Sequence, residues 1–399
     1  MNINCDYCVT YFKELRCKSK YFELNTAAQA SKINYIDNLR VLLTILVILH
    51  HTSITYGAPG GWYFYDKSTN ETAVIFMTLF VAVNQSFFMG FFFFLAALFT
   101  EPSYIKKGAA QFILDRLKRL GLPLLFYSFI FSPVLNFLIY RFGYNKPATF
   151  MQYLKGYDNW IDPGVMWFVA ALLIFTLLYV VYMQILNQKE GKTYSLPGNN
   201  KILLFALILG IISFIVRIFF PVGWVLDPLG FQFAHFTQYI ALFIAGIAAS
   251  RNKWLNEIDI TKGKKWRRLA LILIIAFPLL YGIKIATNSP IESFQGRGSY
   301  QSVLAALWEQ LTGISIMMAL LATAKFKWNY TTPLLKNMAR AAYATYILHP
   351  LAVVAVALIL MHFQIEPALK FLIAAPFVVT ISFLLGLLAV KLPVVKNVL

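Results

Sequence analysis

Ten runs of about 20 mostly apolar residues constrain this chain more than any other feature. They cover residues 36–56, 74–99, 119–140, 165–186, 202–220, 231–250, 269–287, 303–323, 341–361 and 369–390. As a helix, such a run crosses the hydrocarbon core of a bilayer, whereas a membrane β-strand needs only about 9–11 residues. Because 59% of the 399 residues are hydrophobic and only 13% are charged, a soluble fold would leave too much apolar surface in water. The sequence therefore predicts an all-α integral membrane protein with about ten transmembrane helices.

The basic residues indicate how these helices are oriented. Lys and Arg gather in every second loop and at both termini, while the intervening loops hold few of them. Segments rich in Lys and Arg stay on the cytoplasmic side of a membrane. We therefore expect both termini in the cytoplasm and a multi-pass location in the cell (plasma or inner) membrane. The same topology, with contact to anionic lipid, accounts for the net charge of +18, so we expect no nucleic-acid partner.

Residues 1–33 precede the first apolar run and contain the three cysteines, Cys5, Cys8 and Cys17. Cys5 and Cys8 form a C-x-x-C pair, which is typical of zinc or redox sites. Because a fourth ligand is missing nearby, we interpret the segment as a dispensable cytoplasmic leader, with a metal or redox role as the alternative. The segment also lacks the apolar core of a cleavable signal peptide. We expect residues 34–399 to form one ten-helix domain without a metal.

The first apolar run carries ionisable side chains where lipid tolerates them poorly. An α-helix turns about 100° per residue, so the eleven steps from Arg40 to His51 leave these side chains within about 20° of one face and about 16 Å apart along the axis. Asp37 lies one turn before Arg40. Ionisable groups at membrane depth usually face a protein interior or a wet cavity and take part in function. The spacing predicts a polar helix face, with Asp37 and Arg40 at its beginning and His51 as the candidate catalytic base.

Two arginines precede the third apolar run. Arg116 and Arg119 are three residues apart in an amphipathic, basic stretch, so they share one helix face on the expected cytoplasmic side. Two guanidinium groups at such a place suit a phosphate-bearing cofactor. The alternative is that both side chains simply extend toward the membrane surface.

Two further ionisable groups lie inside later runs. Glu309 is about two turns from the outer end of its run, at a depth similar to that of His51. A carboxylate beside His51 would orient the imidazole and make it a competent general base; the alternative is a structural ion pair between Glu309 and an arginine such as Arg217. His349 precedes Pro350, which is expected to kink its helix and open space. We expect His349 in the cytoplasmic half, lining a channel from the inside and binding the cofactor together with Arg116 and Arg119.

Several motifs, taken in order, resemble the membrane-bound acyltransferase 3 family, and within it the glucan-biosynthesis C-type branch. They are IDNLR followed by His51, FFMGFFFFLAALFTEPSYIKKG, FILDRLKRLGLPLLFY, MWFVAALLIF, QYIALFIAGI, ALWEQ and ATYILHPL. The set runs from Asp37 to about Pro350 and covers nearly all ten runs. One departure is that Ala96 and Ala97 stand where the family often has Ser-Gly, which keeps small residues but loses the serine hydroxyl.

The resemblance implies a membrane O-acyltransferase. Such an enzyme takes an acyl group, acetyl or succinyl, from cytoplasmic acyl-CoA and places it on a hydroxyl of an extracytoplasmic or lipid-linked glycan or another small alcohol. By motif position, His51 corresponds to the family's essential histidine, Arg40 to its companion, and Arg116 and Arg119 to the family's Arg-x-x-Arg. Acyl-CoA and the hydroxyl acceptor are then the expected partners besides the lipid bilayer.

Two other classes of function remain open at this point. A transporter or exporter of a small anionic or glycan substrate would use the polar face of the first helix for binding, but it would need a second broken helix near the midplane, for which Pro350 is the single candidate. A scaffold subunit would keep its buried charges for structure alone. Neither of these would consume a thioester.

Overall fold

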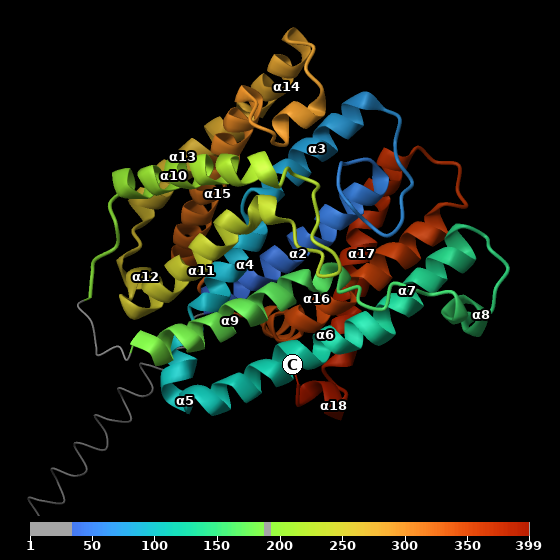
Figure 1. Ribbon diagram of the computed structural model, residues 1–399, viewed down its shortest axis with the longest axis horizontal. Coiled ribbons are helices and arrows are strands. Elements are labelled where there is room, and N and C mark those ends of the chain that lie inside the picture. Colours follow the sequence, from blue (N-terminus) through green and yellow to red (C-terminus); the bar gives the residue numbers. More distant parts are fainter. Residues whose placement is uncertain (1–33, 187–192, 399) are drawn as a thin grey trace, which may run out of the picture.

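The computed structural model describes residues 34–186 and 193–398, and this part of the chain is helical. It contains ten helical segments long and apolar enough to cross a membrane, as the ten apolar runs predict (Figure 1). The predictions for residues 1–33 and their cysteines lie outside the described residues. Within the described ranges, no group of three or more His, Cys, Asp and Glu side chains is placed to hold a metal ion.

Most of the ten segments are single helices, and three are interrupted. The uninterrupted ones are α2 (Asn34–Tyr56), α9 (Trp167–Leu186), α10 (Asn199–Phe219), α11 (Phe236–Arg251), α15 (Tyr300–Lys327), α16 (Pro333–Leu360) and α17 (Pro367–Ala389). The second segment joins α3 (Glu71–Gln85) to α4 (Phe88–Ala97), and the seventh joins α13 (Ile260–Ile275) to α14 (Phe277–Ala286). The third joins α5 (Thr100–Arg116), α6 (Leu122–Phe126) and α7 (Ser132–Leu138) through π-helical turns at Leu117–Gly121, Tyr127–Phe131 and Ile139–Gly143.

Short helices occupy the connections between these segments. They are α8 (Phe150–Lys155), α12 (Trp254–Glu257), α18 (Pro393–Lys396) and the 3₁₀ turns Gly164–Met166, Phe233–His235 and Ile291–Phe294. Helix α12 lies between the sixth and seventh segments. The seventh segment, however, begins at Ile260, nine residues before the predicted run. This extension packs on α15 because Gly263 lets the backbones approach: a Cβ added there would lie 2.2 Å from the Cβ of Ala322.

Helix α2 lies in the middle of the bundle, against α16 and α17 on one side and α4 and α15 on others (Figure 1). We call the end of the bundle where α2 begins the leader end. There the side-chain amide of Asn38 donates to the carbonyl oxygens of Trp328 and Tyr330 at 2.6 and 2.9 Å. The opposite end, which we call the loop end, holds residues 57–70 and the α16–α17 connection. The Asn38 hydrogen bonds hold the beginning of α2 against the connection between α15 and α16.

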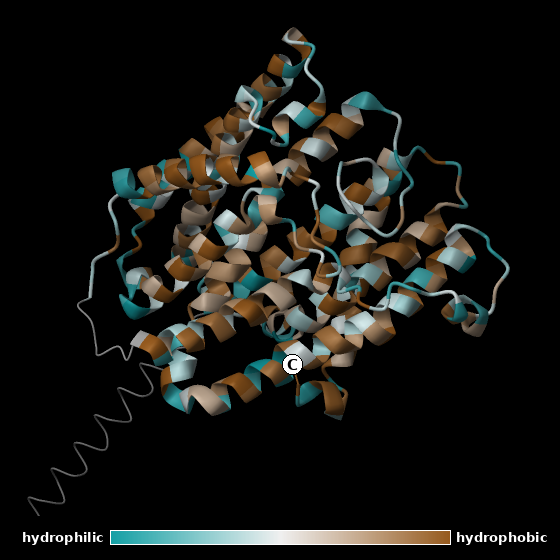
Figure 2. Cartoon of the chain, viewed as in Figure 1, coloured by the Kyte–Doolittle hydropathy of each residue, from teal (hydrophilic) through white to brown (hydrophobic). Residues whose placement is uncertain are grey.

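The surface of the bundle is apolar where lipid would contact it. Only 6% of the most apolar window in Ile260–Ala286 is buried inside the protein, and helices α10 and α17 are also largely uncovered. Figure 2 shows hydrophobic residues along these outer helices and hydrophilic residues in the connecting loops. A helix that is apolar and unburied is stable in lipid and not in water. The protein is therefore a multi-pass membrane protein, and its orientation remains a prediction.

Small residues allow the central helices to approach closely. Ala97, which stands in the place of the family's Ser-Gly, is fully buried, and its Cβ faces Gly246 of α11, where an added Cβ would lie 2.7 Å away. Such small-residue contacts are typical of membrane helix pairs. The close packing expected at Ala96 and Ala97 is therefore present without the serine hydroxyl.

Candidate active site

A group of aromatic rings surrounds His51, in which His349 is buried and His51 and Trp62 are partly buried. The indole of Trp62 stacks on the His51 imidazole, with 3.9 Å between ring centroids and 17° between planes. The imidazole of His349 lies 5.4 Å from that of His51 at 22°, and 6.0 Å from Trp62. We call His51, Trp62 and His349 the histidine chamber. Its members come from α2, from the loop 57–70 and from α16, so three separate segments build it.

The loop 57–70 is tied down in a way that keeps Trp62 over His51. The backbone N–H groups of Asp66 and Ser68 donate to the last carbonyl oxygens of α2, at 2.8 and 3.0 Å. The carboxylate of Asp66 also pairs with Lys370 Nζ at 2.7 Å, and Ser68 hydrogen-bonds to Glu366. The loop is therefore held between α2 and α17. We did not predict Trp62 as a site residue, although its Gly- and aromatic-rich surroundings indicate a cap over the end of the first helix.

Proline chemistry explains how His349 is oriented. In an α-helix the N–H of residue i bonds to the carbonyl of residue i−4, and Pro350 has no N–H, so the carbonyl of Tyr346 loses its helical donor. His349 Nδ1 lies 2.6 Å from this oxygen. Because a carbonyl only accepts hydrogen bonds, Nδ1 must carry the proton. The sequence Tyr-x-x-His-Pro therefore fixes the tautomer of His349.

The chamber contains polar atoms that the protein itself does not satisfy. His51 Nδ1, His349 Nε2 and Trp62 Nε1 are buried and have no hydrogen-bond partner within the described residues. Buried polar atoms are normally paired, so a cluster of exceptions calls for an explanation. A polar ligand bound here could donate a hydrogen bond to His349 Nε2 and accept one from the N–H of Trp62 Nε1.

Tyrosines form one wall beside the chamber. The hydroxyls of Tyr63 and Tyr127 lie 2.9 Å apart, and Tyr346 donates to the carbonyl of Val165. Gly164 makes room for them: its φ is +44°, and an added Cβ would lie 1.9 Å from the Tyr63 oxygen. Burial raises the pKa of Tyr63, so its hydroxyl stays protonated.

Glu309 belongs to a different buried group. Its carboxylate accepts two hydrogen bonds from Arg217 NH2, at 2.7 and 2.8 Å, and lies 3.3 Å from His235 Nδ1. The Arg217 side chain is 1% exposed, and its Nε also donates to the carbonyl of Ala234. We call Arg217 and Glu309 the buried ion pair, and His235 lies beside it. The structure thus brings Glu309 to an arginine, the alternative left open by the sequence, and not to the imidazole of His51.

The other residues predicted from the first helix remain at the leader end. Arg40 pairs with Asp37 at 3.2 Å, and its guanidinium lies 4.8 Å from the ring centre of Phe99. Eleven residues of helix, about 16 Å, separate Arg40 from His51. The two are aligned along one helix, as predicted, but they do not touch a common group.

Arg116 and Arg119 flank the start of the first π-helical turn. Arg116 is half-buried, with its guanidinium 4.7 Å from the ring centre of Phe112, while Arg119 is exposed. The carbonyl of Arg119 accepts a hydrogen bond from Tyr343 of α16 at 3.1 Å. The side chain of Arg119 is exposed, and it forms no ion pair with another described residue.

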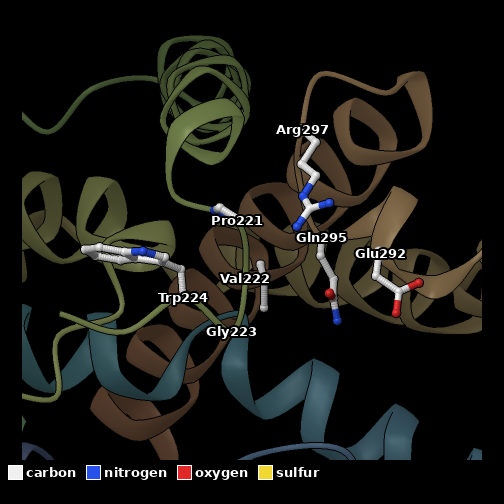
Figure 3. A pocket seen from close by; sticks show the side chains of 7 residues that line it. All are labelled: Pro221, Val222, Gly223, Trp224, Glu292, Gln295 and Arg297. Carbon is white, nitrogen blue, oxygen red and sulfur yellow. The ribbon is translucent and has the colours of Figure 1, made fainter. Parts of the chain in front are cut away.

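A cavity of about 250 Å³ opens at the loop end, lined by residues Pro221, Val222, Gly223, Trp224, Glu292, Gln295 and Arg297 (Figure 3). Its two sides are joined by a hydrogen bond from Val222 N to Gln295 O at 2.9 Å. The backbone N–H of Arg297 donates to the carbonyl of Arg217 at 3.1 Å. The cavity therefore lies next to the residue that anchors the buried ion pair.

Ten apolar helical segments around a cluster of histidine and aromatic rings define a multi-pass membrane protein with polar groups in its interior. The chain belongs to the acyltransferase 3 family, since the family model described as "Acyltransferase domain" matches residues 33–387. This confirms the resemblance stated from the motifs, and it makes the protein a membrane acyltransferase by family.

Two curated relatives are similar to part of this chain. Both are named Glucans biosynthesis protein C: one from Shigella dysenteriae serotype 1 (strain Sd197), 25% identical over 260 residues, and one from Escherichia coli (strain SMS-3-5 / SECEC), 24% identical over 265 residues. Each match covers 63% of this chain and 66% of the relative, slightly under two thirds of the relative's length. No solved structure matches this chain.

Proposed function

We propose that this protein is an O-acyltransferase that moves an acetyl or succinyl group from cytoplasmic acyl-CoA to a hydroxyl group of an extracytoplasmic or lipid-linked glycan or other small alcohol. Family membership supports acyl transfer, and the name of the two relatives favours a glycan acceptor. The observation that carries the proposal is the histidine chamber, in which imidazole nitrogens are buried and find no hydrogen-bond partner among the described residues. This family membership also favours a transferase over a transporter or a scaffold.

The chemistry requires a base and a donor of hydrogen bonds in a dry site. The acceptor hydroxyl loses its proton to an imidazole as its oxygen attacks the thioester carbonyl carbon, and the resulting oxyanion collapses with cleavage of the C–S bond. The leaving thiolate of CoA then takes the proton from the imidazolium. The reaction is therefore neutral overall, and an imidazole that gains and returns one proton is sufficient.

The leader end is the side from which we propose that acyl-CoA enters. Arg40, Arg116 and Arg119 lie there, and the positive-inside pattern assigns this end to the cytoplasm. The phosphates of CoA suit guanidinium groups, and the extended pantetheine arm would carry the thioester along α2 toward His51.

The loop end is the side from which we propose that the acceptor enters. Trp62 closes the chamber toward this end. The cavity beside Arg217 has a carboxylate, an amide and a guanidinium on one side, which can hydrogen-bond a sugar, while the Trp224 indole extends away from them (Figure 3). We therefore propose that a glycan acceptor docks on this end.

Thioester turnover tests the proposal directly. Purified protein in detergent is given acetyl-CoA or succinyl-CoA, with cell-envelope extract as the source of acceptor, and free thiol is followed over time. We expect thiol release that depends on both protein and acceptor, and the preferred donor identifies the acyl group. If neither thioester is bound or consumed, the transferase proposal fails and transport assays become the next step.

Replacing Arg116 and Arg119 by alanine is expected to weaken binding of acyl-CoA by about tenfold or more, because hydrogen bonds to charged groups contribute about 1.5–3 kcal/mol each. The measurement is the KM for the donor, together with its Kd by equilibrium binding. Arg268→Ala is a matched control, since Arg268 is an exposed arginine of α13 at the same end. An equal loss in the control would indicate general electrostatics, and unchanged binding in the double variant would remove these arginines from the donor site.

A further inference from the structure

We infer that His349 is a second catalytic residue of the acyl transfer: its Nε2 accepts the proton of the acceptor hydroxyl, while an N–H of His51 hydrogen-bonds the thioester oxygen as that oxygen becomes an oxyanion. This inference rests on the proposed function. It assigns the role of base to a residue that the sequence placed on the donor side, and it gives His51 a different role from the one predicted.

The first observation is the fixed tautomer of His349. Its Nδ1–H donates to the carbonyl of Tyr346, which Pro350 leaves without a helical donor. In the neutral ring the lone pair is then on Nε2, which is buried and has no partner in residues 34–186 and 193–398. An imidazole held at one nitrogen by a backbone carbonyl, with the other nitrogen free, is the arrangement that a general base requires.

The second observation is that His51 has no such orienting partner. Its Nδ1 is buried and forms no hydrogen bond within the part of the chain that the structure describes, and the carboxylate of Glu309 is held by Arg217 and His235. A neutral imidazole always carries one N–H. Because His51 Nδ1 is buried, an N–H at this atom would be well suited to stabilise an oxyanion, since water does not compete for it.

The third observation is the arrangement of the two rings. Their centroids are 5.4 Å apart and their planes differ by 22°, so two rings of similar orientation border the same small space. The attacking oxygen and the carbonyl oxygen of a thioester are separate atoms of one reacting pair. One ring can therefore serve the hydroxyl while the other serves the carbonyl.

The resulting step is balanced. The hydroxyl proton moves to His349 Nε2, the hydroxyl oxygen forms a bond to the thioester carbon, and the oxyanion is held by the N–H of His51. The C–S bond then breaks, and the thiolate takes the proton from His349. The products are an ester and CoA with a free thiol.

The titratable groups around His349 determine which side chains could cause the pH dependence of the rate. The titratable side chains with rings next to it are His51 from α2 and Tyr346 from its own helix. Beyond them lie His50, whose ring centroid is 5.4 Å from that of His51, and the Tyr63–Tyr127 wall. Tyrosines titrate near pH 10 in water. In the part of the chain that the structure describes, no carboxylate, lysine or arginine forms a hydrogen bond or ion pair with the His349 ring. The fall in rate on the acid side should therefore come from the histidines.

The test compares His349→Gln and His51→Gln, with His362→Gln as a control outside the chamber, where His362 is exposed. The rate constant kcat is measured from pH 5 to 9 with the donor and acceptor that the wild type uses, and donor Kd is measured in parallel. We expect His349→Gln to lower kcat by about a hundredfold or more, to remove the decline at acid pH and to leave the donor Kd within about twofold. His51→Gln should also lower kcat, although its amide can still donate a hydrogen bond. It should keep the acid decline, because His349, the proposed base, is still present.

Several results would overturn the inference. It fails if His349→Gln keeps the acid decline, or if His51→Gln alone removes it. If His349→Gln does not fold, His349→Ala assayed with free imidazole replaces it: rescue supports a lost proton carrier, and no rescue in a folded variant contradicts one. If the wild type releases no thiol with any donor, the proposed function itself fails and the inference fails with it, whereas wild-type turnover with an unaltered His349 variant overturns the inference alone.

Discussion

Replacing Glu309 by alanine is expected to lower the free energy of unfolding by about 3–5 kcal/mol, because it leaves the guanidinium of Arg217 buried without its counter-ion. Arg217 is 1% exposed and Glu309 14%, and two hydrogen bonds of 2.7 and 2.8 Å join them. The remaining contacts of Arg217, to the carbonyl of Ala234 and to His235 Nδ1 at 3.4 Å, carry no negative charge and do not neutralise it. The measurement is equilibrium or thermal unfolding of the purified protein in detergent.

Removing both charges together should restore most of the lost stability. The double variant Arg217→Met/Glu309→Gln keeps side-chain volume and leaves no buried charge, and such replacements of buried pairs are often neutral. Glu292→Ala, at an exposed carboxylate of the same end, is the matched control and should change stability by less than about 0.5 kcal/mol. If the double variant is as unstable as Glu309→Ala, the two residues do not act as a pair.

Replacing His51 by alanine is expected to reduce thioester turnover by about a thousandfold. The change removes the N–H proposed to hold the oxyanion, and loss of one such donor commonly costs about 10²–10³ in rate. It also removes the ring on which Trp62 stacks at 3.9 Å, so the closure of the chamber is lost as well. The measurement is thiol release from the preferred acyl-CoA, with wild type and variant purified in parallel.

Donor binding separates a catalytic effect from a folding effect in this variant. Because Arg40, Arg116 and Arg119 lie at the leader end, away from His51, the Kd for acyl-CoA should stay within about twofold of wild type. Undiminished turnover in His51→Ala would leave the enzyme class in place and remove His51 from its role. A scaffold or a transporter would show no turnover in either protein.

The amino-acid sequence by itself determined the class of fold. Ten apolar runs of about 20 residues leave little choice, because a backbone in lipid must satisfy its hydrogen bonds within each segment. The same local rules aligned Arg40 and His51 on one face, since the helical period fixes angles between residues of one helix. The free carbonyl four residues before Pro350 was also readable from the sequence, although we did not use it to predict the tautomer of His349.

The partners of these residues were decided by the tertiary structure. His51 and His349 are nearly 300 positions apart, and their contact follows from the packing of α2 on α16. The depth of His349 was predicted by counting residues from the start of its apolar run. Helix α16 begins at Pro333, eight residues before that run. His349 therefore lies farther along its helix than predicted, beside His51 and not nearer the leader end. Glu309 was similarly predicted at the same membrane depth as His51, but its carboxylate pairs with Arg217 and His235. Periodicity fixes which face a side chain occupies, whereas only helix packing decides which other helix that face meets.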